Sequence, residues 1–392
     1  MFKIKTYNKI SIKGLERFSR DKYELSSDIG HPDAYILRSY KLPKDDIPQT
    51  VKAVARAGAG VNNIPVNQYT EEGIVVFNTP GANANAVKEL VLAGMLLGSR
   101  GIVQGMAYAQ SLQSMTSVAD MHQQLEGQKK RFAGCELAGK TLGVVGLGAI
   151  GSLVAEMALW LGMNVLGYDP ALSVDAAWRL PSQVQKVENL PSLFAKADYI
   201  TLHVPAIDAT HQLINAELLK GVKPGAVLLN FARESIVDPQ AIVANINAGG
   251  LGQYICDFPE PCLLANDKII AMPHIGASTA EAEENCAVMA ADQLMDYLEN
   301  GNIRNSVNFP AVAMARSGDC RMTFANHNVA GVLGEVLSVF TKHRVNVLDM
   351  VNKSRGDVAY NIIDIEDKDK FNQAVVADID RLDHVIGLRV LS

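Results

Sequence analysis

The sequence predicts an α/β protein with a doubly wound parallel sheet and a separate small unit at its C-terminus. Between residues 140 and 272, short apolar runs alternate with helical stretches, as in a parallel sheet covered by helices on both faces. One junction between a predicted strand and a predicted helix reads Gly-Leu-Gly-Ala-Ile-Gly. Residues 318–392 follow a different order, βαββαβ.

Length and composition indicate a globular chain of two or three domains. The chain has 392 residues, which exceeds one ordinary core, and its 48% hydrophobic and 20% charged residues argue against disorder. The net charge of −6, with no basic patch, predicts neither a nucleic-acid nor a membrane partner. No apolar run is long enough to span a bilayer, and no apolar segment of a signal peptide follows the first lysines. We therefore expect a cytoplasmic protein.

The cysteines predict reduced thiols. Their number is odd, their spacing is irregular, and no pair has the spacing of a zinc site, so neither a disulfide framework nor a metal site is expected. The five are Cys135, Cys256, Cys262, Cys286 and Cys320.

The first 80 residues predict a small α/β unit. Three short apolar runs that end in a polar residue predict strands over 33–39, 51–57 and 75–78, with turns or helices between them. Residues 84–98 then form an apolar helical pattern with few charges, which is typical of a helix buried on most sides.

The middle region continues with the alternation of strands and helices. Ser-Thr-Ala-Glu from Ser278 resembles a capping box and predicts a helix that ends near Asn300-Gly301, followed by a linker over 302–318. The predicted strands are 142–145, 164–167, 199–204, 226–230 and 269–272, and the predicted helices include 149–161 and 239–249. In the C-terminal unit, strands are predicted over 321–326, 345–351, 358–365 and 385–391, and helices over 331–343 and 370–380.

The glycine-rich junction has the pattern and context of a dinucleotide-binding turn. Gly146 would form the tight turn, Gly148 would let the backbone approach a pyrophosphate, and Gly151 would let helix and strand pack closely. Asp169, at the end of the next strand, would accept hydrogen bonds from the ribose and repel a 2′-phosphate, which favours NAD over NADP. The alternative is a glycine-rich turn that binds no cofactor.

Three polar segments follow predicted strands, where an open parallel sheet places its ligands. They span 230–238, 257–261 and 273–279. Oxidation of a hydroxy acid needs a carboxylate clamp and a base, and these roles suit Arg233 and His274, with Glu260 pairing with the histidine. Alternatively, the histidine is structural and the arginine pairs with neighbouring Glu234 or Asp238.

Together these segments resemble the D-isomer-specific 2-hydroxyacid dehydrogenase family. Its pattern of Gly-x-Gly-x-x-Gly, a following Asp, Asn-x-x-Arg-x-x-x-Val-Asp, Asp…Glu-Pro and Pro-His-x-Gly is present in order, although the segment Asp257–Glu260 is shorter than usual. The resemblance implies that Arg233, Glu260 and His274 are catalytic. The cofactor contacts that it implies are Gly146, Gly148, Ala149, Ile150, Gly151, Asp169, His203, Val204, Pro205, Ala232, Arg233, Asp257, His274 and Gly276.

The resemblance also implies a domain order. A Rossmann-type NAD-binding domain, residues 98–275, is expected to be inserted into a smaller flavodoxin-like α/β substrate domain formed by 1–97 and 276–306, with hinges near 98 and 275. Closure of the resulting cleft would expel water from the path of the hydride. Residues 318–392 would form a regulatory domain.

The N-terminal part resembles family members that act on 3-phosphoglycerate. Residues 55–64 match their substrate loop, which implies that Arg56 meets the phosphate, that the backbone at Ala57 and Gly58 meets the carboxylate, and that Asn78 lies on a second loop. Arg233 and His274 would complete the substrate contacts. Lys88 and the run Lys129-Lys130-Arg131, the latter across a dimer, are further candidates for the phosphate; the alternative for the run is a solvated surface.

The C-terminal unit resembles an ACT domain, a regulatory module for small ligands. The match at residues 328–333 implies that Asn328 and Asn346 bind L-serine between paired domains of a homodimer or homotetramer, with Asn326 where some relatives have His. The alternative is a module that only dimerises.

Three hypotheses follow. The first is oxidation of 3-phosphoglycerate with NAD, the first step of serine synthesis, under feedback by serine. The second is a dehydrogenase of another hydroxy acid, such as glycerate or 4-phosphoerythronate. The third is an NAD-sensing protein of the corepressor type.

Overall fold

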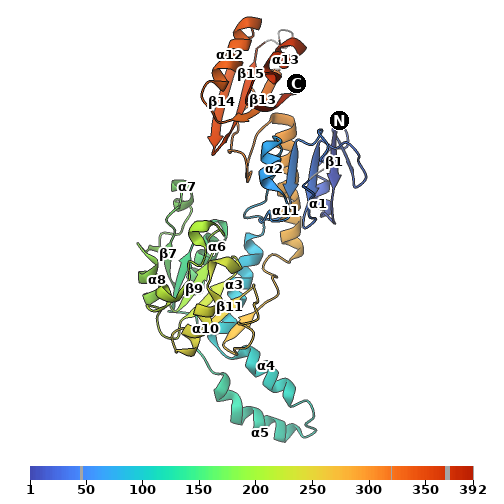
Figure 1. The fold of residues 1–392 in the computed structure, drawn as a ribbon. Coiled ribbons are helices and arrows are strands. Elements are labelled where there is room, and N and C mark those ends of the chain that lie inside the picture. The colour runs from blue at the N-terminus through green and yellow to red at the C-terminus, as the bar shows by residue number, and fades with distance from the viewer. Residues whose placement is uncertain (45–46, 319, 367–370, 392) are drawn as a thin grey trace. The chain divides into compact units, whose positions relative to one another are not determined.

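Two parallel sheets and one antiparallel sheet organise the chain (Figure 1). The computed structural model describes residues 1–44, 47–318, 320–366 and 371–391. They form two compact units, Ala84–Thr279 and a unit that joins Met1–Asn83 with Ala280–Ser392. The α/β class with a Rossmann-type sheet is confirmed. The domain boundaries expected from the sequence stay a prediction.

The unit Ala84–Thr279 contains a seven-stranded sheet in the order β12-β11-β10-β9-β6-β7-β8, with every neighbouring pair parallel. Apolar cores lie on both faces, and α3 packs on α6 over one of them. The strand order reverses at β6, where a doubly wound sheet binds its ligands. The strands are β6 (Thr141–Val145), β7 (Asn164–Tyr168), β8 (Gln185–Lys186), β9 (Tyr199–Leu202), β10 (Val227–Asn230), β11 (Gln253–Cys256) and β12 (Ile269–Ala271). The helices are α3 (Ala84–Ser99), α4 (Ile102–Ser111), α5 (Val118–Gln128), α6 (Ala149–Trp160), α7 (Val174–Ala177), α8 (Leu190–Lys196), α9 (Ala216–Leu219) and α10 (Pro239–Asn247), with 3₁₀ turns η1 (Lys129–Phe132), η2 (Asp208–Thr210) and η3 (Glu234–Ile236).

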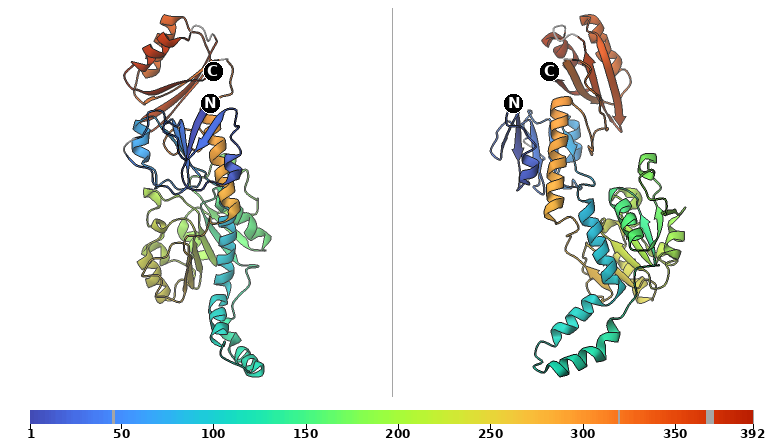
Figure 2. Two further views of the ribbon diagram at one scale, coloured as in Figure 1. Left: turned by 90° about the vertical axis from the view of Figure 1, so that its right-hand side faces the viewer. Right: turned by 180° about the vertical axis from the view of Figure 1, so that it is seen from behind.

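Helices α4 and α5 form a hairpin that the sequence reasoning did not predict. It extends away from the sheet of its unit (Figures 1 and 2), and neither helix contains a buried residue. By length and composition, no single helix in the described part of the chain could cross a membrane. The pair α3 and α4 would pass such a test together, but the two are bent by 68° and α3 packs on α6.

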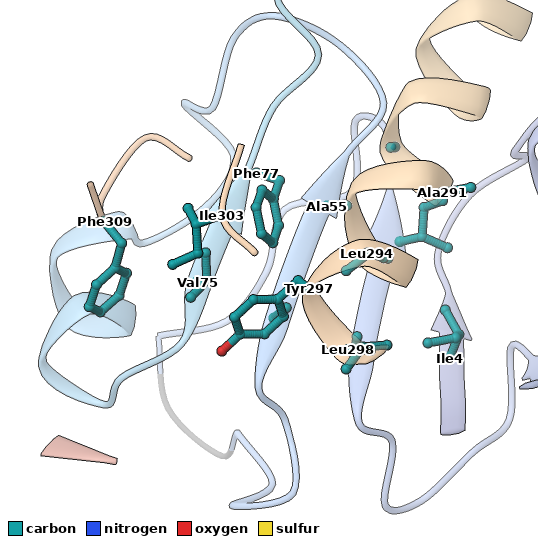
Figure 3. Packing of buried hydrophobic residues seen from close by; sticks show 14 of the residues in the cluster. Ile4, Ala55, Val75, Phe77, Ala291, Leu294, Tyr297, Leu298, Ile303 and Phe309 are labelled. Atoms are coloured by element: carbon teal, nitrogen blue, oxygen red, sulfur yellow. The ribbon is translucent and has the colours of Figure 1, made fainter. Parts of the chain in front are cut away.

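The N-terminal segment of the other unit forms a five-stranded parallel sheet in the flavodoxin-like order β2-β1-β3-β4-β5. Helix α11 covers one face of this sheet. Its Leu294 and Leu298 share a hydrophobic core with Ile4 and Ala55 of the sheet, as Figure 3 shows. Gly14 of α1 meets Ala287 so closely that a Cβ would lie 2.5 Å from its methyl carbon. The elements are β1 (Phe2–Thr6), α1 (Ile12–Leu15), β2 (Tyr23–Ser26), β3 (Ala34–Leu37), β4 (Ala53–Arg56), α2 (Val66–Glu71), β5 (Val75–Phe77) and α11 (Ala280–Asn300).

The expectation of a linker over 302–318 is wrong for most of that segment. Ile303, Phe309 and Val312 are buried in the same core as α11 and the sheet (Figure 3 shows the first two). Asn308 accepts a hydrogen bond from the Val76 N–H and donates to the Ile74 carbonyl, so it binds the edge strand β5 as a further strand would. The segment is therefore part of the fold.

The C-terminal segment confirms the βαββαβ order and fits an ACT-like domain. Its antiparallel sheet has the order β14-β15-β13-β16, and both helices pack on one face, as Figure 2 shows. The other face contributes Tyr360 and Ile362 to the core shared with α11. The elements are β13 (Cys320–His327), α12 (Val332–His343), β14 (Val347–Arg355), β15 (Val358–Ile365), α13 (Gln373–Asp380) and β16 (Val385–Leu391). Residue 370, where helix α13 was expected to begin, lies outside the described residues.

A buried ion pair joins this sheet to α11 and the chain before it. Arg321 and Asp364 are fully buried, and the arginine donates to both carboxylate oxygens at 2.6 and 2.8 Å. Its other donors reach the carbonyls of Asn300, Met314 and Ala315, so all five N–H groups of the guanidinium are used. Burial opposes ionisation, but the bonds from Arg321 and Ser317 hold the pKa of Asp364 below its usual value.

Breaking this pair should destabilise the C-terminal sheet. Arg321→Met leaves the Asp364 carboxylate buried without its cation, which should lower the free energy of unfolding by about 3–5 kcal/mol. Hydrogen exchange of β13 and β15 in the full chain measures the loss. Lys342→Met, which breaks an exposed pair with Asp378, should leave exchange nearly unchanged. Wild-type protection in Arg321→Met would contradict this view.

Candidate functional site

The glycine turn after β6 has room for a pyrophosphate. Gly146 has φ 92°, and a Cβ there would lie 2.6 Å from the His203 carbonyl oxygen. A Cβ on Gly151 would lie 1.9 Å from the Gly146 carbonyl oxygen, whereas one on Gly148 would meet nothing within 4 Å. Gly148 begins α6 without a side-chain cap, so the first N–H groups of the helix remain available to an anion.

Asp169 lies beside this turn at the end of β7. Its carboxylate accepts hydrogen bonds from the Leu147 N–H at 2.8 Å and the Ala171 N–H at 2.9 Å, which fixes the acid against the turn. Each oxygen can still accept a further bond from a ribose hydroxyl. A cavity of about 660 Å³ opens next to it, with Leu147, Leu172 and Val184 in its wall. The turn, the acid and this apolar space fit the adenosine half of NAD.

His203 follows β9 and is neutral. Burial lowers its pKa to about 3, and its Nε2 lies 2.9 Å from the Thr201 hydroxyl. Within the described residues, its buried Nδ1 has no hydrogen-bond partner. Val204 and Pro205, the next two predicted cofactor contacts, continue the chain from this point.

The segment around Arg233 is held by a buried asparagine. Asn230 is fully buried; it accepts a bond from the Ala232 N–H and donates to the Arg233 carbonyl, which closes the turn after β10. The half-buried guanidinium donates to the Ala232 carbonyl at 2.6 Å. Among the described residues it has no acidic partner, and Asp238 instead caps α10 by accepting from Gln240 and Ala241. The alternative pairing of Arg233 with Glu234 or Asp238 is therefore absent from the described structure.

Asp257 fixes the loop that carries His274. Its buried carboxylate accepts bonds from the Ile275 N–H at 2.8 Å and the Gly276 N–H at 2.7 Å. A Cβ on Gly276 would lie only 3.0 Å from this carboxylate. His274 has φ 58°, a backbone conformation that costs energy outside glycine, and its ring lies 4.9 Å from that of Phe258. The carboxylate thus maintains a strained loop that exposes the imidazole.

Glu260 does not pair with His274 in the described residues. Within the described residues, no hydrogen bond or ion pair joins them, and the charge of Glu260 acts on Tyr254. Burial is the main cause that raises the pKa of Tyr254, and Glu260 adds to it. The pairing of Glu260 with His274 stays a prediction.

The strand register brings these segments to one edge of the sheet. Asn230, Cys256 and Ala271 are the paired final residues of β10, β11 and β12. Arg233, Asp257 and His274 therefore follow three adjacent strands at their carboxyl ends. Because all strands of the sheet are parallel, the glycine turn after β6 lies along the same edge.

In the other unit, two arginines lie at the carboxyl edge of the sheet. Arg56 ends β4 beside Leu37 of β3, and Arg38 comes next in the chain. Asn63 connects them, because it accepts from the Arg56 Nε at 3.1 Å and donates to the Arg38 carbonyl at 3.2 Å. Gly58 leaves room for Arg56, since a Cβ there would lie 2.3 Å from a guanidinium nitrogen. Sequence reasoning missed Arg38, although it lies inside the predicted strand 33–39, near its polar end.

Asn78 connects the two predicted substrate loops. Its side chain donates to the Ala59 carbonyl at 2.6 Å, and the Thr79 N–H donates to the Gly58 carbonyl. Gln293 of α11 donates to the Asn78 carbonyl. The Ala57 N–H, which the resemblance assigns to the substrate carboxylate, already donates to the Leu37 carbonyl.

Three of the remaining basic candidates are held by residues three positions earlier in the chain. Lys88 donates to Asn85, Lys129 pairs with Glu126, and Arg131 donates to Gln128. These short-range contacts are those of a solvated surface.

The structure does not bring the three predicted effector residues together within one chain. Asn326 is 6% exposed and bonded to Asn361 and the His327 carbonyl. Asn328 follows the end of β13, whereas Asn346 precedes β14 at the opposite end of the sheet. At about 3.3 Å per residue, the two lie roughly 20–25 Å apart. A small ligand that contacts both must lie between two chains.

Comparisons with known proteins identify the family of the chain. The family model described as "D-isomer specific 2-hydroxyacid dehydrogenase, NAD binding domain" matches residues 106–277. A D-3-phosphoglycerate dehydrogenase of Methanocaldococcus jannaschii is 34% identical over 84% of this chain, which spans 61% of that protein's length. A hydroxypyruvate reductase of Thermotoga maritima is 35% identical over 71% of this chain and 89% of its own length.

Among solved structures, NAD⁺-bound 3-phosphoglycerate dehydrogenase of Entamoeba histolytica covers 78% of this chain and 98% of its own, with 27% identity and a TM-score of 0.60. The family match, the identity with relatives and the geometry of the glycine turn agree. The chain belongs to the D-isomer specific 2-hydroxyacid dehydrogenase family, and its cofactor is NAD.

Proposed function

We propose that the chain oxidises 3-phospho-D-glycerate to 3-phosphohydroxypyruvate with NAD, the first step of L-serine synthesis. The observation that carries the proposal is the pair of arginines, Arg38 and Arg56, at the carboxyl edge of the N-terminal sheet. Relatives named D-3-phosphoglycerate dehydrogenase support it. The second candidate is a dehydrogenase of unphosphorylated glycerate, which the T. maritima relative favours, since hydroxypyruvate is the oxidised form of glycerate.

Two guanidinium groups at this edge can bind an anion. Arg38 pairs with Glu283 at 2.6 Å, and the Arg56 Nε donates to the side-chain oxygen of Asn63 at 3.1 Å. Burial raises the pKa of the nearby Cys286 thiol, and the two arginines oppose that rise, so their positive field reaches the same place. A phosphate has the charge and the acceptor oxygens that guanidinium groups bind best.

The remaining roles fall to the other unit. The fork of Arg233 would hold the substrate carboxylate, and the imidazole of His274 would accept the proton of the C2 hydroxyl. When bound, NAD supplies the hydride acceptor. Asp257 would keep the imidazole exposed through its bonds to Ile275 and Gly276. Glu260 would pair with the imidazole and orient it.

We further propose that L-serine inhibits the enzyme through Asn328 and Asn346 of paired C-terminal domains, and that the chain forms a homodimer or homotetramer in the cytoplasm. The separation of the two asparagines within one chain supports a site between chains.

Arg233→Ala should lower kcat/KM for 3-phosphoglycerate about a hundred- to a thousandfold, because the substrate carboxylate loses its bidentate partner. The affinity for NAD, measured by calorimetry, should stay near the wild-type value. Glu234→Gln changes the exposed neighbour and should leave both quantities unaltered. Near-normal turnover in Arg233→Ala would refute the clamp role.

Arg56→Gln should separate the two candidate substrates. Removal of the cation should lower kcat/KM for 3-phosphoglycerate about ten- to a hundredfold and leave kcat/KM for glycerate nearly unchanged, since only the first carries a phosphate. Arg17→Gln, which removes an exposed cation paired with Asp292, is the matched control. An equal loss for both substrates, or no wild-type preference for the phosphorylated one, would defeat the proposal.

L-serine at millimolar concentration should slow NADH production. Asn346→Ala should weaken that inhibition, because it removes one of the two amides proposed to bind serine. Lys342→Ala, an exposed change in the same domain, should be inhibited as the wild type is. A calorimetric titration without serine binding would remove the feedback role and leave the substrate assignment standing.

A further inference from the structure

A cavity of about 600 Å³ lies between the C-terminal sheet and the amino-terminal ends of β4 and β5. Both walls belong to the same compact unit. One wall comes from β13, β15 and β16, and the other from residues 47–52, the end of α2 and the start of β5. Parallel strands place their amino ends away from the edge that holds Arg38 and Arg56, so this cavity is separate from the proposed substrate site.

Two cations line the cavity without a carboxylate partner in the described residues. Lys52 donates only to the Gln49 carbonyl at 3.0 Å. Arg389 donates to the Tyr297 and Leu298 carbonyls at the end of α11, and its guanidinium lies 4.3 Å from the centre of the Tyr297 ring. These bonds leave three of its five N–H donors for another acceptor.

The acid in this lining does not neutralise both cations. Glu72 accepts a hydrogen bond from Gln68, and its side chain lies at the exposed end of α2. Among the described residues of the lining, Lys52, Arg389 and Glu72 sum to one positive charge. The cavity is therefore suited to an anion.

A buried hydroxyl in the same wall has no partner. Thr323 is 1% exposed, and within the described residues its Oγ1 makes no hydrogen bond. The neighbouring hydroxyl of Tyr360 donates to the Gly301 carbonyl at 2.9 Å, so toward Thr323 it can act only as an acceptor. A buried hydroxyl without a partner is costly, and an oxygen atom of a ligand would satisfy it.

A second cavity, of about 500 Å³, shares Lys52 and Arg389. There Lys22 pairs with Glu299, whereas Arg316 donates to the Leu391 carbonyl and Asp33 accepts from the backbone N–H of Lys3. Of the two cavities, only the first has Thr323 in its lining. The Thr323 hydroxyl therefore distinguishes the first cavity as the place for a ligand.

We propose that this first cavity binds a small organic carboxylate with an apolar body. Arg389 and Lys52 hold the carboxylate, the Thr323 hydroxyl donates to one of its oxygens, and Tyr297, Tyr360 and Ile386 contact the apolar part. The volume lies within the usual range of small-molecule sites. This assignment is independent of the reaction that the enzyme catalyses.

Calorimetric titration of the full chain with benzoate and with hexanoate tests the site. Saturable binding of at least one acid is expected, with no binding of the uncharged benzamide and hexanamide. Lys52→Gln and Arg389→Gln should each weaken binding at least about tenfold, because each removes one charge-assisted bond. Arg381→Gln, an exposed arginine after α13, is the matched control and should bind as the wild type does.

Thr323→Val provides a variant that should fold normally. Valine keeps the shape and removes only the hydroxyl, so the melting temperature without ligand should be unchanged or higher, while the carboxylate binds more weakly. Hydrogen exchange of β13 and β16 in the full chain checks that the unit which carries the cavity is folded in each variant. If Arg389→Gln unfolds, Thr323→Val and Lys52→Gln decide the question. No saturable heat from either acid, or unaltered affinity in these two variants, overturns the proposal.

Discussion

Polar side chains that bind the backbone hold several loops of the candidate site. Asn230 closes the turn that carries Arg233, and Asp257 holds the loop of His274. Asp169 binds the glycine turn, and Asn63 joins the loops of the two N-terminal arginines. A buried polar group must be hydrogen-bonded, so the buried Asn230 and Asp257 each have one low-energy arrangement and impose it on their loops. The reactive side chains can then remain exposed.

A buried polar side chain also attaches the C-terminal sheet to α11 and to the segment before it. Arg321 uses all five donors on partners from α11, the preceding segment and β15, so three pieces of chain distant in sequence depend on one guanidinium. The segment 302–318 is packed rather than free because it supplies two of those carbonyls and several core residues. This face of the sheet thus belongs to the same core as the N-terminal sheet.

The sequence predicted the elements with strong local patterns and missed those decided by distant contacts. The βαββαβ order and the glycine turn follow from hydrophobic periodicity and from steric limits that only glycine meets. The strands β1 and β2 carry mixed polar residues, and α4 and α5 bury nothing, so no apolar period marked them. Arg38 was missed because its nearness to Arg56 depends on strand register, which spacing along the chain does not reveal. For Glu260, a familiar motif predicted a pairing with His274 that the described residues do not contain.

The opposite placement of Asn328 and Asn346 on one sheet has a consequence for any molecule that needs both. A lone chain offers only half of such a site, so the response belongs to the assembly and obeys mass action. Dilution below the dissociation constant of the paired domains would abolish sensitivity without altering a single contact inside the chain. The concentration of the protein in the cell would then determine how strongly the effector acts on it.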